Sequence, residues 1–300
     1  MTPIGLMGAL VLTLSVAGAR AEVVDDLGMT VALPSPPQRI VSLSPGNTEL
    51  LFALNAADRL VGVTGFCDYP EAALQIDRVA GFSTVSLESI VAAKPDLVVA
   101  ARGNPRDALE TLRRMGIPVF ALDIQDIDQL LEAIQRLGLL IDAPEEAAAL
   151  RAALEQRVKA VRARSDALAW RPRLMWGHWS EPIYTAGANT IIDAVFTEAG
   201  GINVGRQAPG AWPQVSLETL VDWAPDVIVT TVHPGTANPP DMTLVVARLQ
   251  QTDGWKTVPA VRHGRVVHID ADLLNRPGPR LIDSLEEISA VLQRVTADVK

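Results

Sequence analysis

Short apolar runs alternate with helix-length segments along most of the chain. The apolar runs predict strands at 39–43, 61–64, 97–100, 119–122, 173–176, 227–230 and 265–269. The segments between them predict helices over 48–54, 86–94, 107–115, 190–199 and from 279 onward. Strands that alternate with helices are typical of parallel βαβ units. The pattern therefore indicates an α/β fold with mainly parallel sheets.

Polar residues and glycines predict several helix ends. The first strand enters a turn at 44–46, and Asn47 is a suitable N-cap for the helix that follows. Ser86 is a suitable N-cap for the helix that ends near Pro95, and the pair Gly200-Gly201 is a plausible C-cap.

A sixteen-residue segment occurs twice. Residues 85–100 return at 215–230 with eight identical positions, and most of the others exchange one apolar or hydroxyl residue for another. This spacing is too long for a solenoid unit and suits a domain. We therefore expect two similar Rossmann-like lobes, each of which contains the same Ser-Leu-Glu helix start.

A long helix of different character is predicted between the lobes. Pro144 suits its first turn, and Glu145 and Glu146 favour its positive end. An apolar stripe follows at Leu150, Leu154, Val158, Val161 and Leu168. The expected division is a signal peptide at 1–21, an N-terminal lobe at 22–142, an inter-lobe helix at 143–170 and a C-terminal lobe at 171–300. A coiled-coil partner helix is the alternative use of the stripe.

The first 21 residues are typical of a secretory signal. Ile4 to Gly18 is apolar, and Ala19-Arg20-Ala21 is a small-x-small cleavage site. Since no Lys or Arg precedes the apolar run, a membrane anchor stays as the alternative. Cys67 is the only cysteine, so no intramolecular disulfide forms and no cysteine at the cleavage site carries a lipid. We expect a periplasmic protein without a lipid anchor, whose mature chain begins near Glu22.

Composition and motif content argue against several classes of function. The net charge of −9 argues against nucleic acid, because phosphate binding needs a basic stripe. No GxGxxG, Walker A or HExxH pattern occurs, and no catalytic triad or carboxylate pair can be assigned. With four histidines lacking ligand spacing, we expect no zinc or manganese cage.

The two copies of the repeat each carry a glutamate, Glu88 and Glu218, in the first turn of the helix. A carboxylate there complements the helix dipole, which is a sufficient structural role. The alternative is a symmetric pair of carboxylates that docks a two-fold basic partner.

Aromatic residues gather at loops. They are Phe66, Phe82, Trp176, Trp179, Tyr184 and Trp212. Phe82 and Trp212 each lie four residues before the serine of a repeat, in strand-to-helix loops that line the ligand crevice of open parallel sheets. The alternatives are core packing or a clasp around a large, flat, partly apolar ligand. His178 lies among them as a hydrogen-bonding residue or as an axial ligand to a metal macrocycle.

Five segments together resemble a known family. They are 39–50, the Asp68-Tyr69-Pro70 turn, the two Ser-Leu-Glu helices and 211–216. They resemble the periplasmic cobalamin-binding proteins of ABC importers, within the helical-backbone (class III) group that also binds ferric siderophores and haem. The resemblance runs from about residue 23 to 295. It implies that Glu88 and Glu218 dock on arginines of two permease subunits. It also implies cobalamin contacts at Phe66, Phe82, Tyr184 and Trp212.

One position departs from that family. Cobalamin binders can place a tryptophan where this chain has Ala101. Trp176 or Trp179 would compensate, or the ligand would be a corrinoid without the full nucleotide loop.

Three functions follow as hypotheses. The first is a monomeric carrier that captures a corrinoid between the lobes and delivers it to an ABC importer, with no catalytic cofactor. The second changes the ligand to haem or a ferric siderophore, whose negative charge would need Arg102, Arg206, Arg276 and Arg280. The third is a two-lobed α/β transferase.

Overall fold

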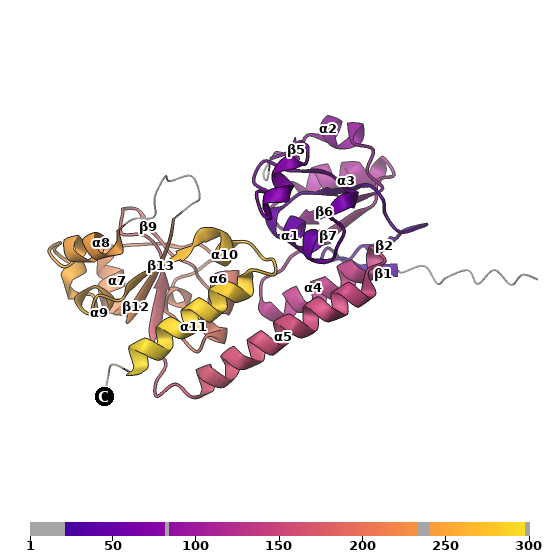
Figure 1. The fold of residues 1–300 in the computed structure, drawn as a ribbon. Coiled ribbons are helices and arrows are strands. Elements are labelled where there is room, and N and C mark those ends of the chain that lie inside the picture. The colour runs from indigo at the N-terminus through magenta and orange to yellow at the C-terminus, as the bar shows by residue number, and fades with distance from the viewer. Residues whose placement is uncertain (1–21, 82–83, 233–240, 298–300) are drawn as a thin grey trace, which may run out of the picture.

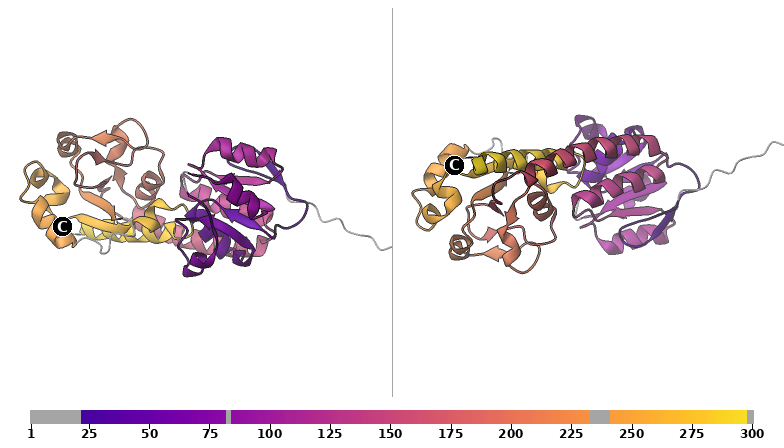
Figure 2. Two further views of the ribbon diagram at one scale, coloured as in Figure 1. Left: turned by 90° about the horizontal axis from the view of Figure 1, so that it is seen from above. Right: turned by 90° about the horizontal axis from the view of Figure 1, so that it is seen from below.

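The computed structural model describes residues 22–81, 84–232 and 241–297. Two α/β lobes lie side by side, and the long helix α5 (Pro144–Asp166) runs along one side of both (Figures 1 and 2). The predicted fold class, two parallel-sheet lobes joined by one long helix, is confirmed. The predicted signal peptide at 1–21 and Phe82 lie outside the described residues.

The N-terminal lobe contains a fully parallel five-stranded sheet. Its strands are β3 (Ile40–Ser42), β4 (Leu60–Thr64), β5 (Arg78–Ala80), β6 (Leu97–Ala101) and β7 (Val119–Leu122), in the spatial order β5-β4-β3-β6-β7. Its helices are α1 (Pro45–Ala53), α2 (Leu87–Ala92), α3 (Arg106–Arg114) and α4 (Ile127–Leu140). The chain moves outward from β3 and then returns to its other side for β6. This creates a topological switch point between β3 and β6, where open α/β sheets bind ligands.

The C-terminal lobe repeats the plan with four parallel strands. They are β8 (Arg173–Trp176), β10 (Ile202–Asn203), β12 (Val227–Val232) and β13 (Val266–Asp270), in the order β10-β8-β12-β13. Its helices are α6 (Ile191–Glu198), α7 (Leu217–Trp223), α8 (Met242–Leu249), α9 (Pro259–Arg262), α10 (Ala271–Asn275) and α11 (Leu281–Ala297).

Two small antiparallel pairs complete the described strands. β1 (Glu22–Val24) pairs with β2 (Thr30–Ala32), and β9 (Ile183–Tyr184) pairs with β11 (Gln214–Val215). Short 3-10 helices lie at Ala57–Arg59, Glu71–Gln75, Val204–Gln207 and Trp255–Thr257.

The first helix begins earlier than the sequence analysis predicts. Ser44, not Asn47, is the N-cap: its hydroxyl accepts a hydrogen bond from the backbone N–H of Asn47, and Pro45 occupies the first turn. Asn47 then lies inside the helix, where its amide donates to the carbonyl of Ala100 at 2.9 Å. The predicted N-cap is therefore wrong, because the side chain of Asn47 instead holds the start of α1 to β6.

The predicted apolar stripe of α5 is covered by two neighbouring helices. Leu154, Val158 and Val161 are buried, and α5 packs against α4 and α11. Helix α4 is not among the predicted helices, although Asp126 caps it and apolar residues recur at 127, 130, 134 and 137. The apolar stripe of α5 therefore packs against helices of the same chain.

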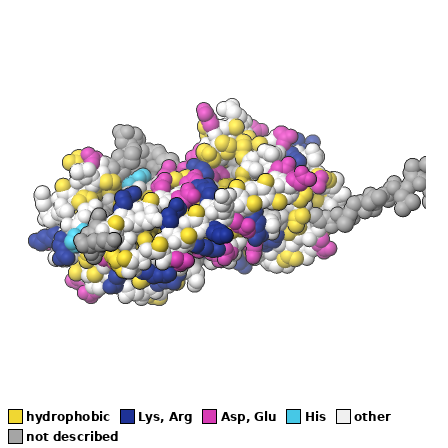
Figure 3. Space-filling model, turned by 60° about the horizontal axis from the view of Figure 1, so that its bottom comes forward, with side chains coloured by type: hydrophobic (Ala, Val, Ile, Leu, Met, Phe, Trp, Pro, Cys, Tyr) yellow, Lys and Arg dark blue, Asp and Glu magenta, His cyan; other side chains and the backbone are white. Residues whose placement is uncertain are grey.

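The surface of the α5–α11 pair carries ion pairs. Arg157 of α5 lies 2.5 Å from a carboxylate oxygen of Asp283 and 2.7 Å from one of Glu286, both on α11. Figure 3 shows acidic and basic side chains interspersed over the face that comes forward. Because these groups are partly exposed, each pair contributes at most about 1 kcal/mol. Burial of the stripe is the larger stabilising term.

One of the apolar clusters extends through both lobes. It includes Phe120 and Leu137 of the N-terminal lobe, Leu154 of α5, and Phe196 and Leu285 of the C-terminal lobe. Since buried side chains are close-packed, displacing one lobe relative to the other would disturb this core. The lobes are therefore restrained along the α5 side.

A second restraint lies at the segment that joins α10 to α11. Glu49 of α1 is buried and accepts two hydrogen bonds from Arg280, at 2.6 and 3.0 Å. The guanidinium of Arg280 lies 3.6 Å from the ring centroid of Tyr69. We call Glu49, Tyr69 and Arg280 the inter-lobe clasp. Beside it, Gly46 packs so closely that a β-carbon would lie 2.5 Å from the carbonyl oxygen of Pro277.

Gly138 tests the packing of α4 on α5. A β-carbon at this position would overlap the methyl group of Ala147. In a solvated helix Gly→Ala stabilises by about 1 kcal/mol, whereas overpacking costs about 1–3 kcal/mol. We expect Gly138→Ala to lower the free energy of unfolding by about 1 kcal/mol in urea titrations. Glu132→Ala, on the exposed face of α4, is the control and should change it by less than about 0.5 kcal/mol. A stabilised Gly138→Ala protein would contradict this packing.

Glu49 gives a test of the clasp by pH. Burial raises the pKa of Glu49 above its ordinary value of 4.5, although the hydrogen bond and charge of Arg280 oppose this. The folded protein then binds the proton more tightly than the unfolded chain does. The contribution of Glu49 to the free energy of unfolding is therefore largest below pH 4.5 and falls as pH rises through the raised pKa.

The quantity to compare is the free energy of unfolding of the wild type minus that of Glu49→Gln. We expect this difference to decrease as pH rises from 4.5 through the raised pKa of Glu49. Urea titrations at several pH values measure it. Glu110→Gln, which removes an exposed carboxylate on α3, is the control. A difference that rises with pH for Glu49→Gln would show that Arg280 outweighs burial.

Candidate functional site

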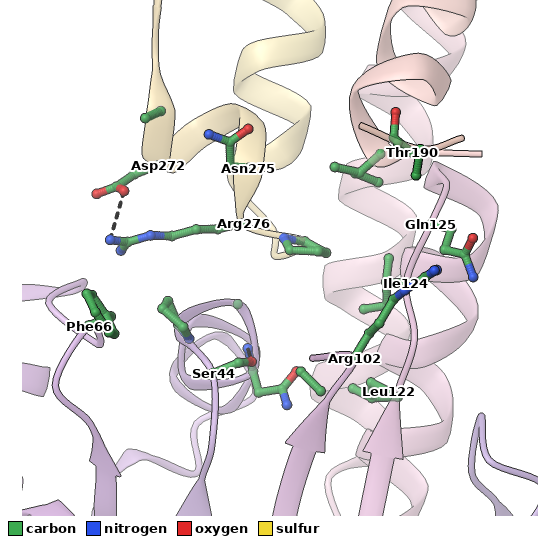
Figure 4. Close-up of a pocket in the computed structure, with 18 of the residues that line it drawn as sticks. Ser44, Phe66, Arg102, Leu122, Ile124, Gln125, Thr190, Asp272, Asn275 and Arg276 are labelled. Carbon is green, nitrogen blue, oxygen red and sulfur yellow. Dashed lines mark hydrogen bonds and ion pairs between the residues drawn. The ribbon is translucent and has the colours of Figure 1, made fainter. Parts of the chain in front are cut away.

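A cavity of about 810 Å³ lies between the two lobes (Figure 4). On the N-terminal side its wall follows the carboxyl ends of β3, β4, β6 and β7, which is the switch-point edge of the sheet. On the other side it follows the end of β13, the start of α6 and the loop before β11. The lining residues are Ser44, Pro45, Gly46, Asn47, Phe66, Asp68, Ala101, Arg102, Leu122, Ile124, Gln125, Asn189, Thr190, Ile191, Ala211, Trp212, Ala271, Asp272, Asn275, Arg276 and Pro277.

Buried amides hold the N-terminal wall in place. The amide of Asn104 donates to the carbonyl of Leu43 at 3.1 Å and accepts from the N–H of Ala101 at 2.7 Å. Asn47 links the start of α1 to the carbonyl of Ala100 in the same way. These bonds join the ends of β3 and β6 across the switch point. The wall is therefore formed before any ligand enters.

Opposite charges compensate each other inside the cavity. The side chain of Arg276 is only 12% exposed and lies 2.5 Å from Asp68 of the N-terminal lobe. It also lies 2.7 Å from Asp272, the ion pair drawn as a dashed line in Figure 4. Burial raises the pKa of Asp272, and the charge of Arg276 only partly offsets this. Burial acts in the same direction on Asp68, but hydrogen bonding and charge from Arg276 outweigh it and lower that pKa. Arg102, more exposed, lies 3.3 Å from Asp123.

The other arginines proposed for an anionic ligand also have acidic partners. Arg280 pairs with Glu49 in the clasp, and Arg206 pairs with Asp193. Neither Arg280 nor Arg206 is part of the cavity lining. Each of the four arginines therefore has a nearby carboxylate.

Two of the aromatic residues predicted to contact ligand line the cavity. Phe66 follows β4 and is 60% exposed, and Trp212 precedes β11 and is 52% exposed. They approach the space from opposite lobes. The matched partner predicted for Trp212, Phe82, is outside the described residues.

The remaining candidates do not line the cavity. Trp176 lies behind Trp212, with ring centroids 5.6 Å apart and planes at 71°. His178 lies behind Trp176, and its Nδ1 is 2.9 Å from the hydroxyl oxygen of Thr230. Trp179 packs against a core of the C-terminal lobe. Tyr184 is an exposed residue of β9.

The segment after β13 is part of the site, although it was not predicted from the sequence. Asp272 and Asn275 belong to the wall, as does Arg276, which was named only as a possible anion partner. The available signal was their position directly after a parallel strand, the same rule that singled out the aromatics.

The two repeated helices have the same local structure. The hydroxyl of Ser86 accepts from the N–H of Ser89 at 3.3 Å, and that of Ser216 accepts from Thr219 at 3.1 Å. Glu88 and Glu218 are exposed in the first turns of α2 and α7. Both carboxylates are therefore accessible to a partner.

Two other kinds of feature are absent from the described part of the chain. None of its helices combines the length and apolarity needed to cross a membrane. Residues 22–81, 84–232 and 241–297 also contain no cluster of three or more His, Cys, Asp or Glu side chains suited to a metal ion.

Similarity to proteins of known sequence extends over most of the chain. Residues 40–273 match the model of a family described as periplasmic binding protein. The vitamin B12-binding protein of Vibrio cholerae is 32% identical over 266 residues, which cover 88% of this chain and 92% of the relative. That of Yersinia pseudotuberculosis is 31% identical over 282 residues, or 93% and 95%.

Solved structures show the same architecture. The periplasmic vitamin B12 binding protein BtuF of Vibrio cholerae has a TM-score of 0.77 at 30% identity, covering 87% of this chain and 99% of that one. A periplasmic heme binding protein from Pseudomonas aeruginosa has a TM-score of 0.73 at 27% identity, covering 86% and 93%. Together, the family match, the relatives above 30% identity and the shared fold show that this chain belongs to the periplasmic binding protein family.

Proposed function

We propose that this protein captures cobalamin or a related corrinoid in the inter-lobe cavity and delivers it to an ABC importer. The observation that carries the proposal is a large cavity whose charges are already paired and whose walls offer the rings of Phe66 and Trp212. A corrinoid presents a broad macrocycle edged with neutral amides, which suits apolar faces and fixed polar groups. The vitamin B12-binding relatives support the same choice.

The charge distribution disfavours a ferric siderophore. Such ligands are anionic, and a carboxylate already accompanies each of Arg102, Arg206, Arg276 and Arg280. An anion at Arg276 would have to displace Asp68 or Asp272, which would leave that carboxylate unpaired near the ligand. The neutral rim of a corrinoid avoids this cost.

The lining disfavours haem as well. None of the described lining residues is a His, Cys, Met or Tyr, the side chains that usually ligate haem iron. His178, the one histidine considered as an axial ligand, contacts Trp176 and Thr230 and does not line the cavity.

Ala101 lines the cavity with only a methyl group, which leaves room for substituents above or below the macrocycle.

The carrier role includes export, docking and release without catalysis. We propose cleavage after Ala21, which leaves β1 intact because that strand begins at Glu22. The mature protein would be a monomer in the periplasm, without a lipid anchor, with lobe boundaries at residues 142 and 171. Glu88 and Glu218 would bind basic residues on the two halves of a two-fold permease.

A fluorescence titration tests the ligand. We expect cyanocobalamin or cobinamide, added at micromolar concentration, to quench tryptophan emission, with weaker effects from haem and a ferric siderophore. Trp212→Ala should raise the corrinoid Kd by about 30-fold or more, since a central aromatic contact is lost. Tyr184→Ala, at an exposed aromatic outside the lining, is the control. Absence of quenching by both corrinoids would refute the proposed ligand.

Charge reversal tests docking. We expect Glu88→Arg or Glu218→Arg to reduce corrinoid uptake by about tenfold or more in proteoliposomes that contain the cognate importer, because like charges then meet. The corrinoid Kd should not change. Glu110→Arg places the same reversal on α3, outside the repeat, and should leave uptake intact. Loss of ligand affinity in the repeat variants would contradict a docking role.

A further inference from the structure

Trp212 is attached to a fixed backbone but has a half-exposed side chain. Gly187 donates its N–H to the carbonyl of Ala211 at 2.8 Å, and Thr185 donates to that of Pro213 at 3.0 Å. These bonds hold the backbone on both sides of Trp212 and leave its side-chain torsions unrestrained. An exposed indole that is free to rotate loses conformational entropy when a ligand stacks on it. Its orientation in the free protein therefore matters for affinity.

Trp176 is the side chain that restrains this indole. Its ring meets that of Trp212 edge to face, with centroids 5.6 Å apart and planes at 71°. It is the last residue of β8, and that strand lies between β10 and β12 with Trp176 paired to Val229. The next residue, Gly177, donates its N–H to the carbonyl of Val229 at 3.0 Å. Trp176 thus projects from a fixed point of the sheet.

Trp176 also contacts a second ring, that of His178. The ring of His178 lies 5.8 Å from it at 69°, and Nδ1 of His178 is 2.9 Å from the hydroxyl oxygen of Thr230 on β12. The indole nitrogen of Trp176 is buried without a hydrogen-bond partner among the described residues. Contacts with the rings of Trp212 and His178, rather than a hydrogen bond from the indole nitrogen, therefore orient Trp176.

The opposite wall makes the orientation of Trp212 more important. Across the cavity, the N-terminal lobe contributes small side chains at Ser44, Gly46 and Ala101. These have no ring face to receive a macrocycle. Among the described lining residues, the only other aromatic is Phe66. A misoriented Trp212 therefore removes the largest ring surface of the site.

We propose that Trp176 is a positioning residue for ligand binding: it holds the indole of Trp212 against the cavity, so that the ligand meets a surface already ordered. The inference rests on the proposed corrinoid function, yet its first step concerns the free protein alone. Trp176 does not line the cavity, and it contributes to ligand affinity by holding Trp212 in place.

The test uses three variants. Trp176→Leu removes the aromatic edge, and Trp176→Phe keeps a ring. Trp170→Leu is the matched control, because Trp170 also packs against the core with a buried, unpaired indole nitrogen but forms no ring contact with Trp212. We expect Trp176→Leu to raise the cyanocobalamin Kd by about three- to tenfold, the equivalent of one edge-to-face aromatic pair. Trp176→Phe should recover most of the loss, and Trp170→Leu should show none.

A second measurement needs no ligand. In protein labelled with 5-fluorotryptophan, the fluorine resonance of Trp212 is identified by its loss in Trp212→Phe. We expect this resonance to broaden or split in Trp176→Leu, because an unrestrained indole samples several orientations, and to stay sharp in Trp170→Leu. A single sharp resonance in Trp176→Leu, even one shifted by the lost ring current of Trp176, would overturn the proposal. A broadened Trp212 resonance in Trp176→Leu together with an unchanged cyanocobalamin Kd would overturn it as well. If the wild type binds no corrinoid, the proposed function fails, and the resonance still decides whether Trp176 positions Trp212.

Discussion

The burial of the apolar stripe of α5 against α4 and α11 is the constraint on which the cavity depends. It joins apolar side chains of the two lobes into one packed cluster, and the cavity is lined by residues of both lobes. The clasp of Glu49, Tyr69 and Arg280 adds a second restraint. A molecule held in both ways offers few residues at which a large hinge motion can occur. Ligand capture in this fold is therefore expected to involve modest closure around a preformed space.

The same restraints explain why the charges near the cavity are paired. Arg276 and Arg280 reach from one lobe toward carboxylates of the other, Asp68 and Glu49, and each arginine is largely buried. A buried guanidinium without a partner would cost several kcal/mol, so the pairs are required by the inter-lobe contact itself. The same pairs also affect which ligands the cavity favours. The charges of the cavity wall therefore nearly cancel, which favours a neutral ligand over an anionic one.

The duplicated segment has diverged around a common local structure. Both copies keep the serine cap and an exposed glutamate in the first helical turn, because capping and the helix dipole act within a few residues. The residues before the cap differ in type, with Phe82 in the first copy at the position of Trp212 in the second. In the second copy Trp212 contributes to the cavity wall and rests on Trp176, which has its own support in β8 and β12.

Sequence alone determined the alternation of strands and helices, the two lobes, the long helix and two of the aromatic residues in the cavity wall, Phe66 and Trp212. Periodicity, capping and the rule that ligands meet the carboxyl ends of parallel strands all operate over short stretches of chain. Tertiary structure decided that Ser44 caps α1 while Asn47 holds Ala100, and that Tyr184, Trp176 and Trp179 lie outside the lining. It also brought Arg276 to Asp68 and Arg280 to Glu49, contacts separated by 208 and 231 residues. Such contacts arise from the packing of one lobe on the other, which no local pattern encodes.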